Sequence, residues 1–293
     1  MLGHTAVGPR GKSSVRVSKK RRTELKTRFT TSNRPDPTDS HYNLCMLNQA
    51  PAPLFSIITV VRNAVGTIEN CIESVKNQSF SDFEYIVIDG LSDDGTSEII
   101  SAHQSAIDTY VREKDAGIYD AMNKAIAMCR GRYIGIINAD DAYFEDTLRN
   151  VQKVIAEFPN AQIVYGGVQI LADGGGTLLV DHSNLDRTMI AHPSCFVSAE
   201  AYRRFGTFNA DFKIAADYDF MLRARNAGAV FQNSGLLLAK YRPGGASAKF
   251  RFNSIKEMIA IQGHHLGWGP IYHRYRLARY LAATYLKPIS PKN

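Results

Sequence analysis

A short apolar run that ends in an amide and two carboxylates is the feature of this sequence with the most direct chemical meaning. Residues 134–137 are Ile-Gly-Ile-Ile, which predicts a buried strand, and Asn138-Ala139-Asp140-Asp141 follows at once. Ligands of parallel α/β proteins bind beyond the carboxyl ends of the strands, and Mg²⁺ prefers carboxylate oxygens. The segment therefore either binds a cation and a diphosphate, or is a strand that ends before a helix capped by Asp141.

Other expected strands also end in polar residues. Taken singly, each group is typical of a turn or a helix cap, but together they should meet at one edge of the sheet. Like charges at one edge repel unless something neutralises them, and a cation with a diphosphate would do so. These groups are Thr59, Arg62 and Asn63 after the first strand, Asp89, Gly90 and Asp93 after the second, and Lys114, Asp115 and Gly117 after the third.

The elements that must position these groups alternate between strand and helix up to about residue 165. Such alternation predicts a mostly parallel sheet with helices on both faces. Arg130-Gly131 is a typical helix C-cap. Expected strands are 55–61, 83–88, 110–111, 133–137, 163–165, 193–197 and 230–242, expected helices are 66–78, 118–129, 144–157, 199–205, one from about 217, 255–264 and about 270–286, and a hairpin is expected around 174–176.

Charge and cysteine content restrict the class of protein. The net charge of +7 comes from residues 1–50: residues 1–34 hold ten Lys or Arg and one Glu, and Asp36 and Asp39 remove two of these nine positive charges, so residues 51–293 sum to zero. We therefore expect a basic, disordered tail over 1–50 and no nucleic-acid partner. The four cysteines are widely spaced and no apolar run reaches the ~18–20 residues that span a bilayer, which favours a cytoplasmic protein. A dinucleotide-binding Gly-x-Gly-x-x-Gly motif is missing.

Four motifs follow one another along the chain. They are Phe-Ser-Ile-Ile-Thr-Val-Val-Arg-Asn at 55–63, Asp-Phe-Glu-Tyr-Ile-Val-Ile-Asp-Gly at 82–90, Ser-x-Asp-Gly-Thr at 92–96 and Asp-Ala-Gly-Ile-Tyr-Asp-Ala-Met-Asn-Lys at 115–124. Taken together they resemble the start of a family 2 glycosyltransferase with the GT-A fold, and the last is similar to the subgroup that builds colanic-acid-like polysaccharides and glycolipids. The resemblance implies an α/β, Rossmann-like, mostly parallel sheet flanked by helices over 51–250, with a C-terminal helical extension over 251–293.

The same resemblance implies a nucleotide-sugar site. Asp89 would accept a hydrogen bond from a ring N–H of the base. Asp140 would bind a divalent cation, Mn²⁺ or Mg²⁺, with Asp141 as second ligand or as a helix cap. Asn138 replaces the first acid of the family's Asp-x-Asp motif. The implied donor-binding set is Thr59, Arg62, Asp89, Gly90, Asp93, Lys114, Gly117, Asp120, Asn123, Lys124, Asn138 and Ala139.

Asp217 takes the place of the family's catalytic base, in Ala216-Asp217-Tyr218-Asp219, where the family has Glu at 216. A positioned carboxylate can remove the proton of an attacking hydroxyl. The alternative is a charge that stabilises a helix N-terminus, whose dipole would weaken the base. Two helical residues two apart point about 200° away from each other, so Asp217 and Asp219 cannot serve one site. The acceptor and lid set is His192, Asp219, Arg242, Gly245 and Ser247.

The resemblance implies an inverting, metal-assisted transfer from a UDP-, GDP- or dTDP-sugar to a saccharide or lipid-linked acceptor. An inactive scaffold of a polysaccharide-synthesis complex is the alternative suggested by Asn138 and Ala216. A sugar nucleotidylyltransferase is a second alternative, although the loop at 62–66 has one Gly only. The aromatic and Arg residues of 266–286 suit either an interfacial helix that makes peripheral membrane contact or a helix packed on the domain.

Overall fold

The computed structural model describes residues 51–172, 174–245 and 251–267, together with positions 269, 271, 275 and 278. The chain divides into Met1–Ala50 and Pro51–Asn293, and the description concerns the second unit. The expected tail over 1–50 and most of the helix expected over 270–286 lie outside the described residues.

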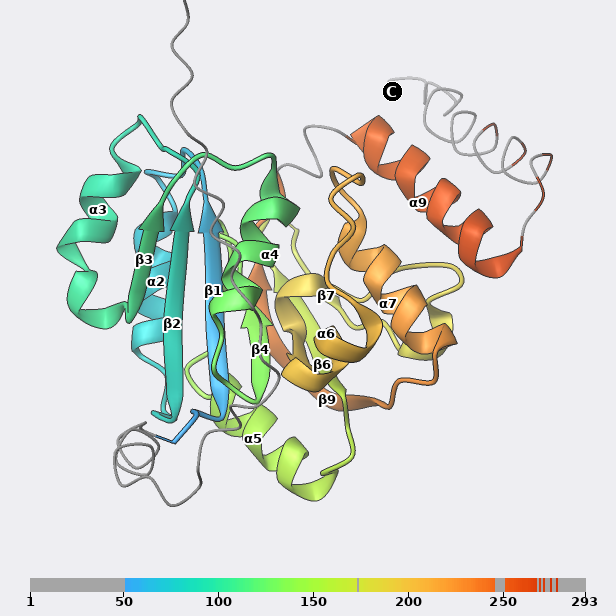
Figure 1. Ribbon diagram of the computed structural model, residues 1–293, viewed down its shortest axis with the longest axis horizontal. Helices are drawn as coiled ribbons and strands as arrows, with labels where there is room; N and C mark the ends of the chain where they lie inside the picture. Colours follow the sequence, from blue (N-terminus) through green and yellow to red (C-terminus); the bar gives the residue numbers. More distant parts are fainter. Residues whose placement is uncertain are drawn as a thin grey trace, which may run out of the picture. The chain divides into compact units, whose positions relative to one another are not determined.

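One nine-stranded sheet forms the centre of the described unit, in the order β3-β2-β1-β4-β8-β6-β9-β5, with β7 paired to β6 (Figure 1). The first four strands along this order are all parallel. Their carboxyl ends therefore lie at the same edge of the sheet, which we call the carboxyl edge. These strands are β1 (Phe55–Val61), β2 (Phe83–Asp89), β3 (Thr109–Arg112) and β4 (Tyr133–Ile136).

The second half of the sheet is mixed. Strand β8 is antiparallel to both β4 and β6, whereas β9 is parallel to β6. Strand β7 forms the expected hairpin with β6, and β5 is antiparallel to β9. The strands are β5 (Ala142–Tyr143), β6 (Ile163–Ile170), β7 (Thr177–Leu178), β8 (Cys195–Ser198) and β9 (Phe231–Tyr241).

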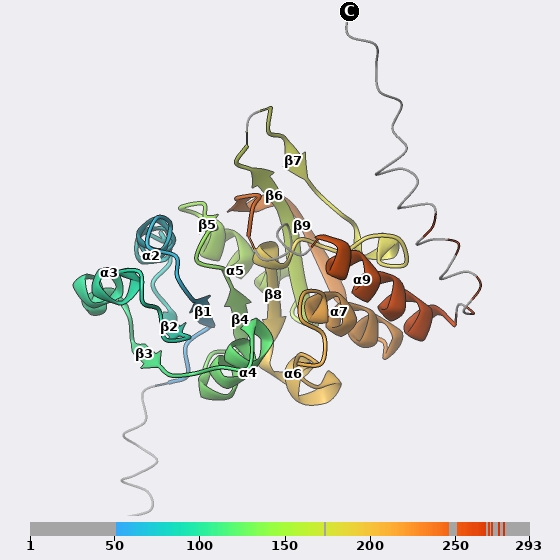
Figure 2. The same ribbon diagram turned by 90° about the horizontal axis from the view of Figure 1, so that it is seen from above.

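Helices cover both faces of the sheet, as the alternation predicted (Figure 2). The core on one face includes side chains of α2 (Ile68–Lys76), α3 (Thr96–Ala102) and α5 (Thr147–Glu157). The core on the other face includes α4 (Ile118–Met128), α6 (Ala199–Phe205), α7 (Ala216–Asn226) and α9 (Arg251–Leu266). Three short 3₁₀ helices complete the described elements: η1 (Gln104–Ala106), η2 (His182–Asn184) and η3 (His192–Ser194).

Strand β1 shows how the sequence pattern produces these two layers. Phe55, Ile57 and Val61 belong to the core beneath α2, and Ile58 and Val60 belong to the core beneath α4. Successive side chains of a strand point to opposite faces of the sheet. A central parallel strand is covered by helices on both faces, so it carries apolar side chains on both. All seven residues of β1 are buried, and its two polar side chains, Ser56 and Thr59, are hydrogen-bonded to Glu84 and Tyr85.

Gly131 has a different role from the expected helix cap. Helix α4 ends at Met128, and the next residue, Cys129, is already extended, with φ −66° and ψ 134°. A Cβ atom on Gly131 would overlap the backbone of Phe55 and Ser56. Glycine is needed because the chain passes against β1 here, so the C-cap prediction was wrong.

The C-terminal helix α9 packs against α7 and contributes Ile261 to the core beneath α4 and α7. Among the residues that the structure describes, none of the helices combines the length and apolar character needed to cross a bilayer.

Candidate active site

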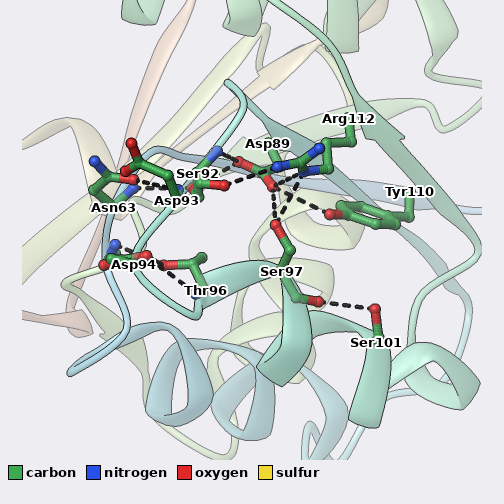
Figure 3. Close-up of polar contacts among 11 residues, drawn as sticks. Asn63, Asp89, Ser92, Asp93, Asp94, Thr96, Ser97, Ser101, Tyr110 and Arg112 are labelled. Carbon is green, nitrogen blue, oxygen red and sulfur yellow. Dashed lines mark hydrogen bonds and ion pairs between the residues drawn. The ribbon is translucent and has the colours of Figure 1, made fainter.

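The loops that follow β1 and β2 are held together by hydrogen bonds at the carboxyl edge (Figure 3). The backbone N–H of Asn63 donates to Oγ of Ser92 at 2.9 Å, and the N–H of Asp93 donates to Oδ1 of Asn63 at 3.0 Å. Asn63 has a positive φ of 54°, a conformation that asparagine tolerates better than most residues. The two loops therefore form one unit, with the side chain of Asp93 exposed.

Asp89 is fully buried in this unit, and its carboxylate already has protein partners (Figure 3). Its Oδ1 accepts from the N–H and the hydroxyl of Ser92, at 2.8 and 2.6 Å. Its Oδ2 accepts from Ser97 at 2.7 Å and Tyr110 at 3.1 Å, and lies 3.3 Å from Nε of Arg112.

Burial alone would raise the pKa of Asp89, but the hydrogen bonds from Ser92, Ser97 and Tyr110 outweigh it, so the pKa is lowered. The carboxylate is 0% exposed and accepts hydrogen bonds at both oxygens, so in this structure it fixes the loop after β2. The expected contact of Asp89 with a base stays a prediction.

Thr59 also faces the core. Its hydroxyl lies 2.9 Å from the hydroxyl of Tyr85 and 3.6 Å from Sγ of Cys71, and the residue is 0% exposed. It shares the face of β1 that α2 covers, so the expected contact between its side chain and a nucleotide is contradicted.

Three other predicted residues do meet at the carboxyl edge. A Cβ atom on Gly90 would overlap Oδ2 of Asp115 and would lie 3.6 Å from Cβ of Arg62. The loops after β1, β2 and β3 therefore touch at Gly90, where a larger residue would displace the Asp115 carboxylate. The side chains of Arg62 and Lys114 are exposed. Gly117, with φ 129°, begins the turn into α4 and requires glycine for that conformation.

The predicted residues of α4 have protein partners. The side-chain amide of Asn123 donates to the carbonyl of Phe208 at 2.8 Å and accepts from its N–H at 3.0 Å. Lys124 pairs with Glu113 at 2.9 Å and with Asp120 at 3.2 Å. In this structure Asn123 fastens α4 to the loop after α6, and Lys124 joins α4 to the loop after β3.

The segment after β4 places Asp141 in an apolar surrounding. Asp141 is 1% exposed, its Oδ1 accepts from the N–H of Arg242 at 2.9 Å, and Nδ2 of Asn138 lies 3.5 Å from its Oδ2. Burial, together with the charge of Asp140, raises the pKa of Asp141 to about 7. Oδ1 of Asn138 is buried without a hydrogen-bond partner, and Ala139 packs in the core.

Asp141 does not cap a helix. Strand β5 follows it directly, and α5 begins only at Thr147, after Asp146. The capping alternative for Asp141 is therefore wrong.

The loop after β9 lies against the two acids. A Cβ atom on Gly245 would be 2.6 Å from Oδ2 of Asp140, and the backbone of Arg242 already bonds to Asp141. The side chain of Arg242 is exposed, and Ser247 lies outside the described residues. Over the described part of the chain, no three His, Cys, Asp or Glu side chains gather as a metal site. Two carboxylates and the unpartnered amide oxygen of Asn138 are the oxygen set that a hard cation would find here.

Asp217 lies in the first turn of α7 and is 7% exposed. Its Oδ1 lies 2.9 Å from the hydroxyl of Tyr119, and accepts from the N–H of Tyr218 at 3.0 Å. Tyr119 is in the first turn of α4, which starts from the carboxyl edge after β3. The contact therefore places Asp217 at that edge too.

Asp219 points elsewhere, as its spacing predicted. Its Oδ1 lies 2.8 Å from Nε2 of His265, and its Oδ2 lies 3.3 Å from Arg223. His192 is partly buried, with its ring 5.9 Å from that of Phe208. Burial lowers the pKa of His192, against the opposing effect of the Asp217 charge.

Two residues near Asp217 were missed from the sequence. Tyr119 lies inside the motif at 115–124, and an aromatic hydroxyl in the first turn of a helix that starts at the carboxyl edge was an available signal. Glu257 of α9 gave no signal. Its carboxylate accepts three backbone N–H groups just before α7, from Lys213 at 2.9 Å, Ile214 at 2.9 Å and Ala215 at 3.0 Å.

A hollow of about 240 Å³ lies away from all these residues, at the amino ends of β1 and β4. It belongs to the edge of the sheet opposite the candidate site. Its lining residues are Leu54, Arg132, Gln152, Ile155, Ala156 and Pro159.

Comparison with solved structures defines the class of fold. A complex of residues 1–349 of TarS from S. aureus with UDP-GlcNAc superposes with a TM-score of 0.62 at 16% identity, covering 79% of this chain and 73% of that one. The mannosyltransferase PcManGT from Pyrobaculum calidifontis, with GDP-Man and Mn²⁺, gives 0.61 at 18%, covering 86% and 83%. The fold is that of the GT-A glycosyltransferases, as the sequence implied.

Sequence relatives define the family. A PGL/p-HBAD biosynthesis glycosyltransferase of Mycobacterium bovis (strain BCG) is 30% identical over 202 residues, covering 66% of this chain and 78% of that protein. The chondroitin synthase of Escherichia coli is 28% identical over 186 residues, covering 60% of this chain and 27% of that protein. The profile described as Glycosyl transferase family 2 matches residues 56–220, more than half of the chain. The chain belongs to this family and is a glycosyltransferase.

Proposed function

We propose that this glycosyltransferase moves a sugar from a nucleoside-diphosphate donor to a hydroxyl of a saccharide or lipid-linked acceptor, with inversion at the anomeric carbon. Family membership supports sugar transfer. The similar folds solved with UDP-GlcNAc and with GDP-Man support a nucleotide-sugar donor. The inverting outcome follows from the family resemblance.

The donor would lie across the carboxyl edge, where the loops after β1, β2 and β3 meet at Gly90. The exposed cations Arg62 and Lys114 suit the charge of a diphosphate. The exposed Asp93 and the turn at Gly117 flank the same loops. Asp89 supports this surface from beneath.

A divalent cation, Mn²⁺ or Mg²⁺, would be held by Asp140 and Asp141, with the amide oxygen of Asn138 as a third ligand. The unpartnered, buried Oδ1 of Asn138 and the raised pKa of Asp141 support this assignment, because both are relieved by a positive charge. When bound, the cation supplies charge neutralisation for the leaving diphosphate.

Asp217 would act as general base. The acceptor hydroxyl gives its proton to the Asp217 carboxylate while its oxygen forms a bond to the anomeric carbon. The bond from that carbon to the diphosphate oxygen breaks, and the diphosphate leaves with the electron pair. The acceptor side of the site would include His192 and the loop from Arg242 to Gly245.

The observation that carries this proposal is the position of Asp217, a carboxylate 7% exposed and held by Tyr119 at the carboxyl edge. The test is release of nucleoside diphosphate from UDP-, GDP- and dTDP-sugars with Mn²⁺. We expect Asp217→Asn and Asp140→Ala to lose at least ~100-fold in turnover. Asp82→Asn, at the opposite edge, is the matched control and should keep it.

Other results would select an alternative. Donor binding in thermal-shift assays, with no turnover by the wild type on any donor and acceptor, would favour an inactive scaffold. Release of pyrophosphate from a nucleoside triphosphate and a sugar phosphate would favour a nucleotidylyltransferase.

Peripheral contact with an anionic membrane is part of the same proposal. It is supported by the exposed side chains of Ile271 and Tyr275, which are 85% and 53% exposed. Co-sedimentation with anionic vesicles, compared with neutral vesicles, measures this contact. Equal recovery from both would contradict it.

A further inference from the structure

The hydroxyl of Tyr119 lies within hydrogen-bond distance of two acceptors. It is 2.9 Å from Oδ1 of Asp217 and 2.8 Å from the carbonyl oxygen of Ile214. A phenol has one proton, so it can donate fully to one of these acceptors at a time. Tyr119 is 6% exposed, and leaving either polar group without a partner in such a place costs free energy.

We propose that Tyr119 is a two-position donor that serves both protonation states of Asp217. It donates to the Asp217 carboxylate before transfer, and turns to the Ile214 carbonyl once Asp217 has taken the acceptor's proton. The inference rests on the proposed role of Asp217 as general base. Tyr119 is a positioning residue, because it acts through Asp217.

One proton moves in the transfer step, from the acceptor hydroxyl to Asp217. The proton of the acceptor hydroxyl passes to Asp217, whose Oδ1 is already held by Tyr119 and by the N–H of Tyr218, so Oδ2 receives it. Tyr119 keeps its own proton throughout, and Asp217 later releases the transferred proton to solvent. Burial and the Asp217 charge hold the pKa of Tyr119 well above its ordinary value of 10, which agrees with a neutral phenol.

The second acceptor is fixed in place by α9. The N–H groups of Ile214 and Ala215 both donate to Oε2 of Glu257, at 2.9 and 3.0 Å. The peptide segment that carries the Ile214 carbonyl therefore cannot drift away from Tyr119. Helix α9, through Glu257, therefore keeps the Ile214 carbonyl within reach of the Tyr119 hydroxyl.

The other titratable groups around Asp217 do not replace Tyr119. Burial lowers the pKa of His192 and raises the pKa values of Cys195 and Tyr202, so all three are neutral near pH 7. Glu257 is engaged by the backbone of 213–215. The groups that face Asp217 are Tyr119 from α4, His192 from η3, Cys195 from β8, Tyr202 from α6 and, through the loop before α7, Glu257 from α9.

The test is the pH profile of kcat/KM for Tyr119→Phe, which removes the hydroxyl and keeps the ring packed on Phe208, measured at Mn²⁺ concentrations that saturate the enzyme at every pH so that Asp141 does not set the acidic limb. Loss of a hydrogen bond to the ionised carboxylate favours the protonated form. We expect the acidic limb of the profile to move to higher pH by about one unit, which corresponds to one charge-assisted hydrogen bond. The KM for the donor should stay as in the wild type.

Tyr165→Phe is the matched control, because Tyr165 donates to the carboxylate of Asp181 at 3.0 Å in another part of the sheet. Its acidic limb should not move. If Tyr119→Phe unfolds, 3-fluorotyrosine at position 119, a stronger donor, should move the limb to lower pH.

Different results would contradict the role of Tyr119 and the role of Asp217. An acidic limb that stays in place in Tyr119→Phe, or in the fluorinated protein, while Asp217→Asn is inactive, overturns the role of Tyr119 alone. Wild-type turnover in Asp217→Asn overturns the general base itself.

Discussion

Protonation of Asp141 should make the stability of the metal-free protein depend on pH in an unusual direction. This acid is 1% exposed and accepts a backbone hydrogen bond from Arg242, and burial raises its pKa from the ordinary value of 3.8 to about 7. Most carboxylates in proteins show the opposite shift, so that acid destabilises the fold.

The size of the effect on the free energy of unfolding follows from the difference between the pKa of Asp141 in the folded and in the unfolded protein. The unfolded chain releases the Asp141 proton near pH 3.8, whereas the folded protein keeps it up to about pH 7. The folded state therefore holds more protons in this interval, and its free energy of unfolding falls as the pH rises. The contribution is fully present below pH 3.8, is lost as the pH approaches 7, and amounts to roughly 4 kcal/mol.

The assay is urea unfolding of the wild type and Asp141→Asn between pH 4 and pH 8, without divalent cations. Other carboxylates titrate in both proteins, so the difference between them isolates Asp141. We expect the wild type to lose stability relative to the variant by roughly 4 kcal/mol on going to pH 7, and Mn²⁺ to restore much of it in the wild type alone. A difference that does not change with pH would refute the reasoning.

Three further changes test the backbone around the site. Gly131→Ala should lower the free energy of unfolding by at least ~3 kcal/mol in urea titrations, because the new Cβ meets the backbone at Ser56 and not a movable side chain; unchanged stability would contradict this close approach. Glu257→Gln should cost ~1–3 kcal/mol, since a neutral amide replaces a carboxylate that accepts three N–H groups; a loss below 0.5 kcal/mol by the same method, a threshold set at roughly the low end of that range, would contradict it. Gly245→Ala should push the Asp140 carboxylate aside and weaken Mn²⁺ binding ~10-fold in calorimetry, with stability unchanged; wild-type affinity would remove Asp140 from the cation site.

The sheet could be predicted from the sequence because its first half depends on local patterns. The strand at Phe55–Val61 was predicted with its observed bounds, and the helix over 199–205 likewise. Strand β6 was too short in the prediction, because it continues from Ile163 to Ile170, past the Gly166-Gly167 pair. Both glycines are needed because neighbouring chain at Leu236 and Leu178 leaves no room for a Cβ atom, a contact that sequence reading cannot supply.

The main error at the strand ends was the orientation of Thr59. Thr59 alternates with Ile57 and Val61 and so faces α2, and Asp89 alternates with Tyr85 and so faces α3. The alternation was visible, but which face opens to a ligand depends on where the helices pack. The brace from Glu257 to the backbone of residues 213–215 crosses more than forty residues and was equally hidden.

Fewer of the acids at the strand ends need a cation than the sequence predicted. Acids at successive strand ends were expected to repel one another unless a bound cation neutralised them. The protein neutralises several by itself: Asp89 pairs with Arg112, and Asp120 with Lys124.

Asp141 is different, because burial, together with the charge of Asp140, raises its pKa to about 7. The charge that a divalent ion would compensate is thus localised at the end of β4, beside the unpartnered oxygen of Asn138. Binding of the cation should therefore follow the ionisation of one buried acid, and activity at subsaturating Mn²⁺ should fall as the pH drops below about 7, whereas saturating Mn²⁺ should remove this dependence.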